Sequence, residues 1–368
     1  MIEKILAYIL ACCNNSEFEQ TTVALISENL KISRSQVSVV LNKLVKENKL
    51  IRIESKPFCF ISVEYLKEKS IPFKDSVYAS LDDLLSNQEK KDFEKLVGMN
   101  HSLAQTVKQC KATISYPPNG LPMLLYGPTG TGKSLIAKLT YEWARNQGVI
   151  SKDGQFVQVN CSEYANNPEL LTANLFGHVK GAFTGAEKDN EGLIALADNG
   201  VLFLDEVHEL KAECQEKLFL FMDQGIYHRV GDNEKWYKSN VRIVFATTEN
   251  PDKVLLKTLM RRIPMTITIP SLEQRGTQER IELLYDIFSR EEKRLNCQIK
   301  MSSKVYNALL QSKMPGNIGQ LKSSVQSCCI NSLFDKVNDE LVIHLDSLPK
   351  DLLQQVYANQ KTVLDDDE

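Results

Sequence analysis

The sequence predicts an α/β fold with a mainly parallel five-stranded sheet, a small helical unit before it and a helical lid after it. Three observations support this prediction. In the middle of the chain, short apolar runs alternate with segments of helical periodicity, which is typical of a parallel sheet covered by helices on both faces. A glycine-rich loop separates the first apolar run from an amphipathic segment. Beyond Pro270 the pattern is helical from about Gln278 to Val337.

Residues 1–65 predict three helices and a β-hairpin. Ser33 is placed to cap a third helix that runs to about Asn48. Two extended runs follow, at Leu50–Ile53 and Phe58–Ile61. Three helices followed by a hairpin are typical of a winged helix-turn-helix domain, which binds DNA through its third helix.

The polar face of this third helix carries side chains that can reach base edges and phosphates. The alternative is a helical protein–protein module with a solvated basic face, and the joint presence of turn, polar face and hairpin favours DNA. Lys49, Arg52 and Lys56 would surround the hairpin. The expected DNA contacts are Arg34, Ser35, Gln36, Ser38, Asn42 and Lys46.

The remaining chain is expected to divide into four parts. Residues 66–92 are interpreted as a helical linker, 93–272 as the α/β domain, 273–345 as the helical lid and 346–368 as an acidic tail or linker. The strands of the α/β domain are expected at Met123–Tyr126, Phe156–Val159, Val201–Leu204, Val241–Ala246 and Met265–Ile269.

Composition limits the classes of function. The formal net charge is −3, so any DNA contact has to come from a local basic patch. The nine cysteines form no Cys-x-x-Cys pair, and we expect buried, reduced thiols. The chain has neither an apolar signal core at its start nor an apolar run that could span a bilayer. We therefore expect a cytoplasmic protein with no membrane partner.

The glycine-rich loop after Met123–Tyr126 predicts a site for ATP. Backbone N–H groups of such a loop and of the following helix N-terminus surround phosphate oxygens. Lys133 should reach the β- and γ-phosphates, and Ser134 should bind Mg²⁺. The residues expected around the phosphates are Gly127, Pro128, Thr129, Gly130, Thr131, Gly132, Lys133 and Ser134.

Two acidic residues end the apolar run at Val201–Leu204. Asp205 is expected to hold Mg²⁺, directly or through water, and Glu206 to polarise the attacking water. Asn160 ends the neighbouring run, where its amide could come near Glu206. Together these residues predict hydrolysis of the nucleotide.

The hexapeptide Gly181–Ala186 predicts a mobile loop with an apolar tip. Glycines at 181 and 185 allow the backbone to bend sharply on either side of an exposed Phe183–Thr184 pair. The alternative is that Phe183 packs inside the domain.

From about Leu96 to about Asn331, the chain resembles the AAA+ domain of sigma-54-dependent transcriptional activators. The resemblance rests on Leu175–Ala186, Gly200–Val207, Gln224–Gly231 and Pro315–Ile318. The N-terminal unit, Tyr164–Leu170 and Arg261–Met265 resemble more narrowly the LevR-type regulators of sugar-uptake (phosphotransferase) operons.

This resemblance implies a role for each matching residue. Phe183, Thr184 and the rest of the hexapeptide (Gly181, Ala182, Gly185, Ala186) would contact sigma-54, and residues 225–233 would form a second loop that moves with it. Asn160 would be a switch partner of Glu206, and Thr247 and Thr248 would sense the γ-phosphate. Arg261 or Arg262 would be an arginine finger reaching a neighbouring subunit of a ring, commonly a hexamer. The adenine pocket would be lined by Leu96, Val97 and Gly98.

The sequence departs from the general pattern of this family at a few positions. Thr248 stands where Asn is usual, and Val179 stands where Glu is usual. Gly319 stands where the lid usually carries Arg, which puts a guanidinium contact from that position in doubt. The regulatory domains that continue LevR-type chains are not visible here.

Three functions are compatible with these motifs. The first is an ATP-driven activator that binds upstream promoter DNA and remodels the sigma-54 RNA polymerase. The second is a DNA-binding regulator whose nucleotide only gates assembly, which would not need the hexapeptide. The third is a chaperone-type remodelling ATPase, which would not need the DNA-binding unit.

Overall fold

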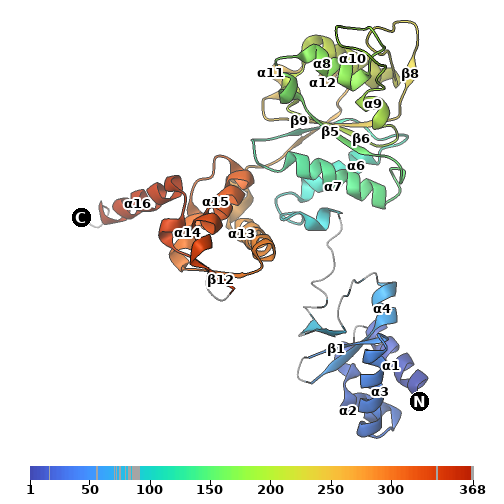
Figure 1. The fold of residues 1–368 in the computed structure, drawn as a ribbon, viewed down its shortest axis with the longest axis vertical. Helices are drawn as coiled ribbons and strands as arrows, with labels where there is room; N and C mark the ends of the chain where they lie inside the picture. Colours follow the sequence, from blue (N-terminus) through green and yellow to red (C-terminus); the bar gives the residue numbers. More distant parts are fainter. Residues whose placement is uncertain are drawn as a thin grey trace. The chain divides into compact units, whose positions relative to one another are not determined.

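The structure is a computed structural model that describes residues 1–15, 17–54, 57–69, 71, 73, 76–78, 80–81, 84, 92–336 and 339–365. The chain forms two compact units, Met1–Lys90 and Lys91–Glu368 (Figure 1). Each unit is described on its own.

The N-terminal unit contains the helices and the hairpin expected from the sequence. Its helices are α1 (Ile2–Asn14), α2 (Val23–Leu30) and α3 (Arg34–Lys46). β1 (Leu50–Ile53) and β2 (Cys59–Ser62) pair in antiparallel register. Side chains from the helices and strands share one apolar core, which is why these short elements are stable together.

Ser33 caps α3, as predicted. Its hydroxyl accepts a hydrogen bond from the backbone N–H of Gln36 at 3.4 Å and donates one to the side-chain oxygen of Gln36 at 2.9 Å. Ser33 and Gln36 therefore form a local pair that fixes the start of the helix.

The predicted linker at 66–92 begins too early. α4 (Val63–Glu68) crosses the expected boundary, and β3 (Val77–Tyr78) pairs in parallel with β1. Leu66, Tyr78 and Leu84 are buried in the core of the N-terminal unit. These scattered apolar residues complete that core, so they belong to it and not to a linker. Lys56 and residues 85–91 lie outside the described residues.

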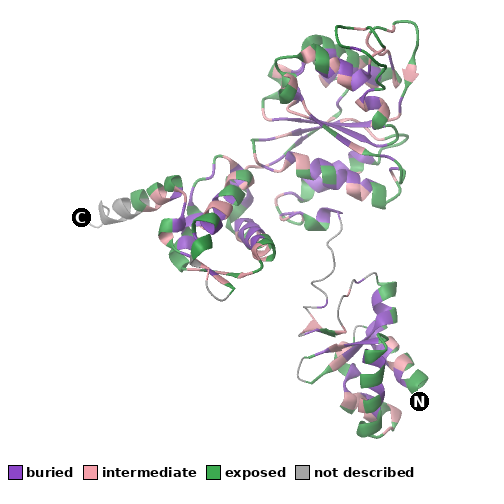
Figure 2. Cartoon of the chain, in the orientation of Figure 1, coloured by how far each residue is buried: buried purple, intermediate pink, exposed green. Residues whose placement is uncertain are grey.

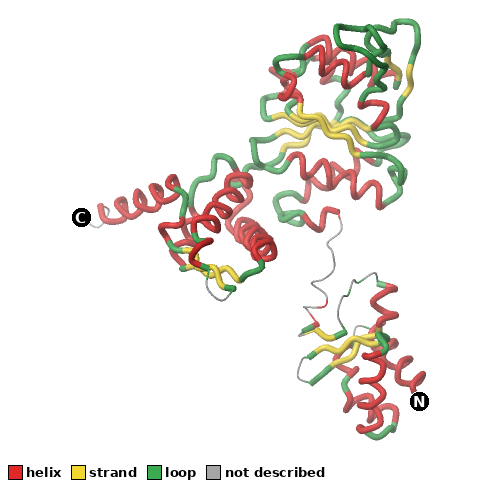
Figure 3. The backbone as a smooth tube through the Cα atoms, viewed as in Figure 1, coloured by secondary structure: helices red, strands yellow, loops and turns green. Residues whose placement is uncertain are grey.

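The second unit is built on the five-stranded parallel sheet that the sequence predicts. Its strand order is β10-β4-β9-β6-β5, and every neighbouring pair is parallel (Figure 3). The strands are β4 (Met123–Tyr126), β5 (Phe156–Asn160), β6 (Val201–Asp205), β9 (Arg242–Thr247) and β10 (Met265–Thr268). Because the strands are parallel, their carboxyl ends meet at one edge, where polar residues follow β4, β6 and β9.

Helices cover both faces of this sheet, and the strands between them are buried (Figures 1 and 2). α6 (Ala104–Ile114) and α7 (Lys133–Asn146) lie on one face and share an apolar core with it. α8 (Pro168–Phe176) and α10 (Ala212–Gln224) lie on the other face. Shorter elements on this second side are α9 (Leu193–Leu196), α11 (Pro251–Val254), α12 (Lys257–Met260) and the hairpin of β7 (Ile226–Tyr227) with β8 (Tyr237–Lys238).

The lid has its own apolar core and is not wholly helical, contrary to the sequence prediction. Its helices are α13 (Gly276–Leu295), α14 (Ser303–Gln311), α15 (Asn317–Asn331) and α16 (Lys350–Asp365). β11 (Gln298–Met301) and β12 (Glu340–Ile343) form a parallel pair between them. Ile299 and Met301 pack against the lid core, which explains how this short alternating run becomes a strand.

The predicted acidic tail at 346–368 is also incorrect over most of its length. Leu348 and Leu352 are buried in the lid core, and Leu353 and Val356 pack against it. This apolar spacing makes α16 a packed helix of the lid. Residues 366–368 lie outside the described residues.

Single-turn 3₁₀ segments connect several elements: Phe18–Thr21, Asp92–Lys95, Cys161–Tyr164, Val207–Glu209, Glu273–Arg275, Leu333–Asp335 and Leu345–Ser347. In the described part of the chain, none of the helices has the length and apolar character needed to cross a membrane.

Candidate functional site

The glycine-rich loop leaves the carboxyl end of β4 and leads directly into α7. Gly130 and Gly132 have φ angles of 76° and 99°, which side-chain-bearing residues rarely adopt. Lys133 is buried at the start of α7, and its amine donates hydrogen bonds to the carbonyls of Gly127 at 2.9 Å and Pro128 at 3.3 Å. Burial lowers the pKa of Lys133, while the carboxylates of Glu206 and Asp205 oppose this shift. The loop therefore holds a cation beside exposed backbone N–H groups, as an anion site requires.

Ser134 and Asp205 meet at the foot of the loop. The hydroxyl of Ser134 donates to Oδ2 of Asp205 at 2.8 Å. A hydroxyl and a carboxylate are oxygen ligands of the kind that Mg²⁺ prefers. The two residues that the sequence assigns to the metal are thus neighbours, and this pair fits such an ion beside bound phosphates.

Glu206 is held in an unusual conformation at the end of β6. Its backbone lies in the left-handed region, with φ 51° and ψ 49°, which costs a residue other than glycine about 1 kcal/mol or more. The hydroxyl of Thr248 donates to its Oε2 at 3.1 Å, and Nδ1 of His208 lies 3.4 Å from the same oxygen. His208 also contacts Thr247 Oγ1 at 3.1 Å. Glu206 is therefore oriented by Thr248, which follows β9, and by His208 from its own loop.

Asn160 does not make the contact with Glu206 that the sequence suggests. It lies opposite Asp205 in the β5–β6 register, and its side-chain oxygen accepts from the backbone N–H of Ser162 at 3.1 Å. A second hydrogen bond to this oxygen comes from the Ser162 hydroxyl at 2.9 Å. Register alone could not reveal this local competition. His208, which the sequence analysis did not single out, is instead a neighbour of Glu206.

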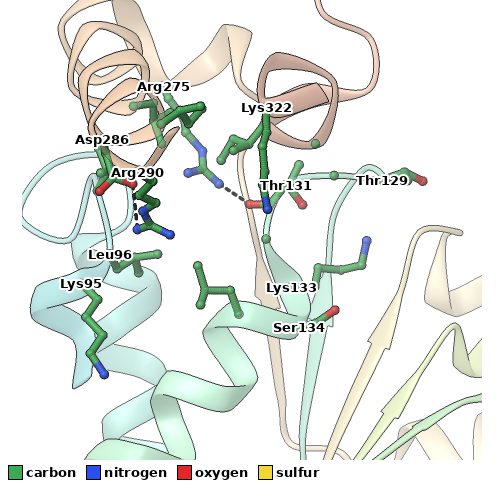
Figure 4. A pocket seen from close by; sticks show the side chains of 18 of the residues that line it. Lys95, Leu96, Thr129, Thr131, Lys133, Ser134, Arg275, Asp286, Arg290 and Lys322 are labelled. Atoms are coloured by element: carbon green, nitrogen blue, oxygen red, sulfur yellow. Dashed lines mark hydrogen bonds and ion pairs between the residues drawn. The ribbon is translucent and has the colours of Figure 1, made fainter. Parts of the chain in front are cut away.

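A cavity of about 560 Å³ lies between the loop and the lid (Figure 4). Leu96 and Val97 line it, as expected for an adenine site. Gly98 is not among its lining residues. Gly98 instead adopts φ 87° against the buried side chain of Glu279, where a Cβ would collide.

Among the described residues, the lid contacts the phosphate loop through three hydrogen bonds. Arg275 donates to the carbonyl of Thr131 at 2.7 Å, Asn317 donates to that of Thr129 at 2.9 Å, and the N–H of Gly319 donates to that of Gly130 at 3.2 Å. Sequence analysis missed Arg275 and the role of Asn317, because their partners are backbone atoms more than a hundred residues away. In the third contact Gly319 takes part through its backbone N–H, and a Cβ at this position would lie 3.5 Å from the Cα of Gly130, an ordinary van der Waals distance.

The two candidate finger residues differ in their surroundings. Arg262 forms an ion pair with Asp223 at 2.8 Å and lies over the ring of Phe219 at 5.0 Å. Arg261 is exposed, and within the described ranges its guanidinium has no hydrogen-bond or ion-pair partner. Arg261 is therefore the residue that can reach outward without breaking an internal contact.

The hexapeptide forms a small closed turn on the side of the sheet covered by α8 and α10. The N–H of Gly181 donates to the carbonyl of Ala186 at 2.8 Å, and the N–H of Ala186 donates to that of Phe183 at 3.0 Å. Phe183 is 40% exposed and rests one edge on the ring of His178, with 4.9 Å between centroids. Thr184 is exposed. The apolar tip is therefore a surface feature, and Phe183 is not part of a core.

A second loop supports this turn. The N–H of Val179 donates to the carbonyl of Val230 at 3.1 Å, and the N–H of Val230 donates to that of Gly177 at 2.9 Å. Gly231 lies so close to Ala182 that a Cβ there would collide. The segment between β7 and β8 is thus joined to the hexapeptide loop by backbone hydrogen bonds.

Comparisons with known proteins agree with this geometry. The sequence profile of the Sigma-54 interaction domain matches residues 96–267, which include the phosphate loop, Asp205–Glu206 and the hexapeptide. The transcriptional regulatory protein LevR of Bacillus subtilis is 42% identical over 350 residues, which is 92% of this chain and 37% of that protein. The chain contains a Sigma-54 interaction domain and is similar to the regulator LevR over nearly its whole length.

Other relatives of this chain are consistent with that similarity. The transcriptional regulatory protein DagR of Salmonella typhimurium is 38% identical over 317 residues, covering 84% of this chain and 34% of that protein. The chain thus spans little more than a third of the length of these two regulators. The crystal structure of NtrX from Brucella abortus in complex with ATP has the same fold, with a TM-score of 0.59 at 21% identity, covering 80% of this chain and 65% of that one.

Proposed function

We propose that this chain is a DNA-bound transcriptional activator that uses ATP hydrolysis, in a ring of identical subunits, to remodel the sigma-54 RNA polymerase. Its targets would be sugar-uptake operons, as the likeness to LevR-type regulators suggests. The protein would act in the cytoplasm. The observation that carries the proposal is the combination of a nucleotide cavity with an exposed hexapeptide turn in one domain.

Residues of the phosphate loop and residues at the end of β6 would have different roles in hydrolysis. The loop N–H groups and Lys133 bind and orient the phosphates. Ser134 and Asp205 would hold Mg²⁺, which supplies charge neutralisation on the phosphates. Glu206 would accept a proton from the attacking water, and Thr248 keeps its carboxylate aimed.

A ring would complete the site. Arg261 has no internal partner among the described residues, so its guanidinium is free to stabilise charge on the nucleotide of a neighbouring subunit. Arg262 would stabilise the position of this segment through Asp223. Hydrolysis would then depend on assembly.

The hexapeptide turn would be the part that touches sigma-54. Phe183 and Thr184 are exposed, and neither is among the described residues that line the nucleotide cavity. An exposed aromatic side chain beside a threonine gains apolar burial and a hydrogen bond only when a partner covers it. The neighbouring β7–β8 loop would move with the turn because the two share backbone hydrogen bonds.

DNA binding would come from α3. Arg34, Asn42 and Lys46 are exposed on this helix. Gln36 is engaged with Ser33 at the helix start, so Arg34 and Asn42 are better placed to read bases. Replacing Lys46 with Ala should weaken binding to all DNA sequences. It should also reduce the slope of the logarithm of the binding constant against the logarithm of salt concentration by about 1. Replacing Arg34 with Ala should instead relax sequence preference.

One experiment tests the proposal as a whole. The full chain is mixed with purified sigma-54 in the presence of ADP alone or of ADP with aluminium fluoride, which mimics the transition state of hydrolysis. We expect capture of sigma-54 only with the mimic. Equal capture in both states, or none in either, would contradict an ATP-driven contact.

A further inference from the structure

Among the described residues, one basic side chain of the cavity between the loop and the lid makes neither an ion pair nor a hydrogen bond. Five basic residues line it: Lys95, Lys133, Arg275, Arg290 and Lys322. Lys95 pairs with Glu142 at 3.1 Å, and Arg290 pairs with Asp286 at 2.7 Å.

Two of the other three are also engaged. Lys133 donates to loop carbonyls, and Arg275 donates to the carbonyl of Thr131 and lies 3.5 Å from Glu279. Lys322 is different: in the part of the chain that the structure describes, its amine has no hydrogen-bond or ion-pair partner. An ammonium group that lines this cavity and makes no ion pair is free to bind an anion.

The position of Lys322 follows from how α15 meets the loop. The N–H of Gly319 donates to the carbonyl of Gly130, and the Gly130 Cα would lie 3.5 Å from a Cβ built at Gly319. Lys322 is three residues further along the helix and therefore lies on the same face. Figure 4 shows its side chain extending from α15 toward the loop near Thr131.

The acidic side chains of the lid that line the cavity are already engaged. Asp286 holds Arg290, and Glu291 accepts from Gln326 at 2.9 Å and lies 3.8 Å from Arg294. The plain alternative is a solvated lysine on the surface of the lid, since Lys322 is exposed. That alternative predicts no effect of this residue on nucleotide binding.

We propose that Lys322 binds the phosphates of the nucleoside triphosphate. It would supply the positive charge of the lid that position 319 lacks, from a position about one helical turn later in α15. This inference rests on the proposed ATP site. Because Lys322 belongs to the lid and the phosphate loop to the α/β domain, the same contact would tie lid position to the presence of phosphates.

Affinity measurements on the full chain test the inference. The dissociation constant of a slowly hydrolysed ATP analogue is measured by calorimetry for the wild type, Lys322→Ala and Lys322→Arg. Loss of a charge-assisted contact should weaken binding by about tenfold or more in Lys322→Ala. Lys322→Arg keeps the charge and should stay within about threefold of the wild type.

Lys304→Ala is the matched control, because Lys304 is an exposed lysine of the lid that does not line the cavity. It should bind as the wild type does. The melting temperature of Lys322→Ala should change by no more than about 2 °C, since the residue is exposed.

The outcomes separate this inference from the proposed function. If Lys133→Ala abolishes binding while Lys322→Ala stays within about threefold of the wild type, Lys322 has no role in binding. If Lys322→Arg binds as weakly as Lys322→Ala, charge is not what matters and the inference is wrong. If the wild type itself shows no saturable binding, the ATP site fails, and the inference fails with it.

Discussion

Two glycine-containing loops of the α/β domain differ in what holds them. The phosphate loop is fixed from both sides: its carbonyls accept from Lys133 within the domain and from Arg275 and Asn317 of the lid. The hexapeptide loop bonds to itself and to the neighbouring β7–β8 segment. A Cβ at Gly130 would collide with the lid, whereas a Cβ at Gly185 would meet nothing within 4 Å.

This difference assigns different tasks to the two loops. A loop that orients phosphates for hydrolysis needs fixed geometry, because small displacements of reacting groups are costly. A loop that contacts a separate protein needs an exposed surface with few internal contacts. Changes at the nucleotide site should therefore remove hydrolysis, and changes in the hexapeptide should spare it.

The largest effect is expected at Arg261. Arg261→Ala should reduce ATP turnover about 10³-fold or more, because the guanidinium would act on the nucleotide of a neighbouring subunit. Arg262→Ala should cost less turnover, since Arg262 is held by Asp223. Steady-state phosphate release by each variant measures the difference.

Mixed assemblies sharpen this prediction. Arg261→Ala subunits mixed with Glu206→Gln subunits should regain part of the activity, because some interfaces then carry both groups. If mixed rings form and no mixture regains activity, Arg261 does not act across an interface.

The next largest effect is expected at Glu206. Glu206→Gln should lower turnover by about 10²–10⁴-fold while leaving ATP affinity nearly unchanged, because the carboxylate acts on water. Lys133→Ala should instead weaken ATP binding, which calorimetry distinguishes. Turnover of Glu206→Gln close to that of the wild type would show that another residue is the base.

A pair of glycine replacements tests the loops directly. Gly185→Ala should cost about 1–2 kcal/mol for its positive φ and leave hydrolysis intact. Gly130→Ala should cost more, because its Cβ would also meet the carbonyl of Gly316, and it should lose nucleotide affinity. Thermal unfolding and ATP titration of both variants measure these effects. Equal loss of nucleotide affinity in the two would contradict the distinction.

Sequence reasoning succeeded where the signal is local. The five central strands were predicted from apolar runs, and the phosphate loop from its glycines and its place between strand and helix. The Ser33 cap was predicted from residue type and spacing. Each of these features depends on residues that are adjacent or nearly adjacent in the chain.

Prediction from the sequence failed where interacting residues are far apart in the chain, or where another residue competes for the same side-chain group. Tyr78 and Leu352 looked like residues of a linker and a tail, because the cores that bury them are made elsewhere in the chain. The two hydrogen bonds from Ser162 to the side-chain oxygen of Asn160 were not predicted, because they depend on the local turn after β5. The contacts of Arg275 and Lys322 with the nucleotide cavity depend on how the lid meets the loop, which no motif records.

The central claim is that ATP hydrolysis and its output reside in separate loops, and Phe183→Ala tests it most directly. Because Phe183 is 40% exposed, its truncation should cost less than about 1 kcal/mol, whereas the buried control Phe203→Ala should cost about 3–5 kcal/mol. Phe183→Ala should hydrolyse ATP as the wild type does and fail to support open-complex formation by sigma-54 polymerase in vitro. Unimpaired transcription, or a stability loss as large as that of Phe203→Ala, would contradict the account.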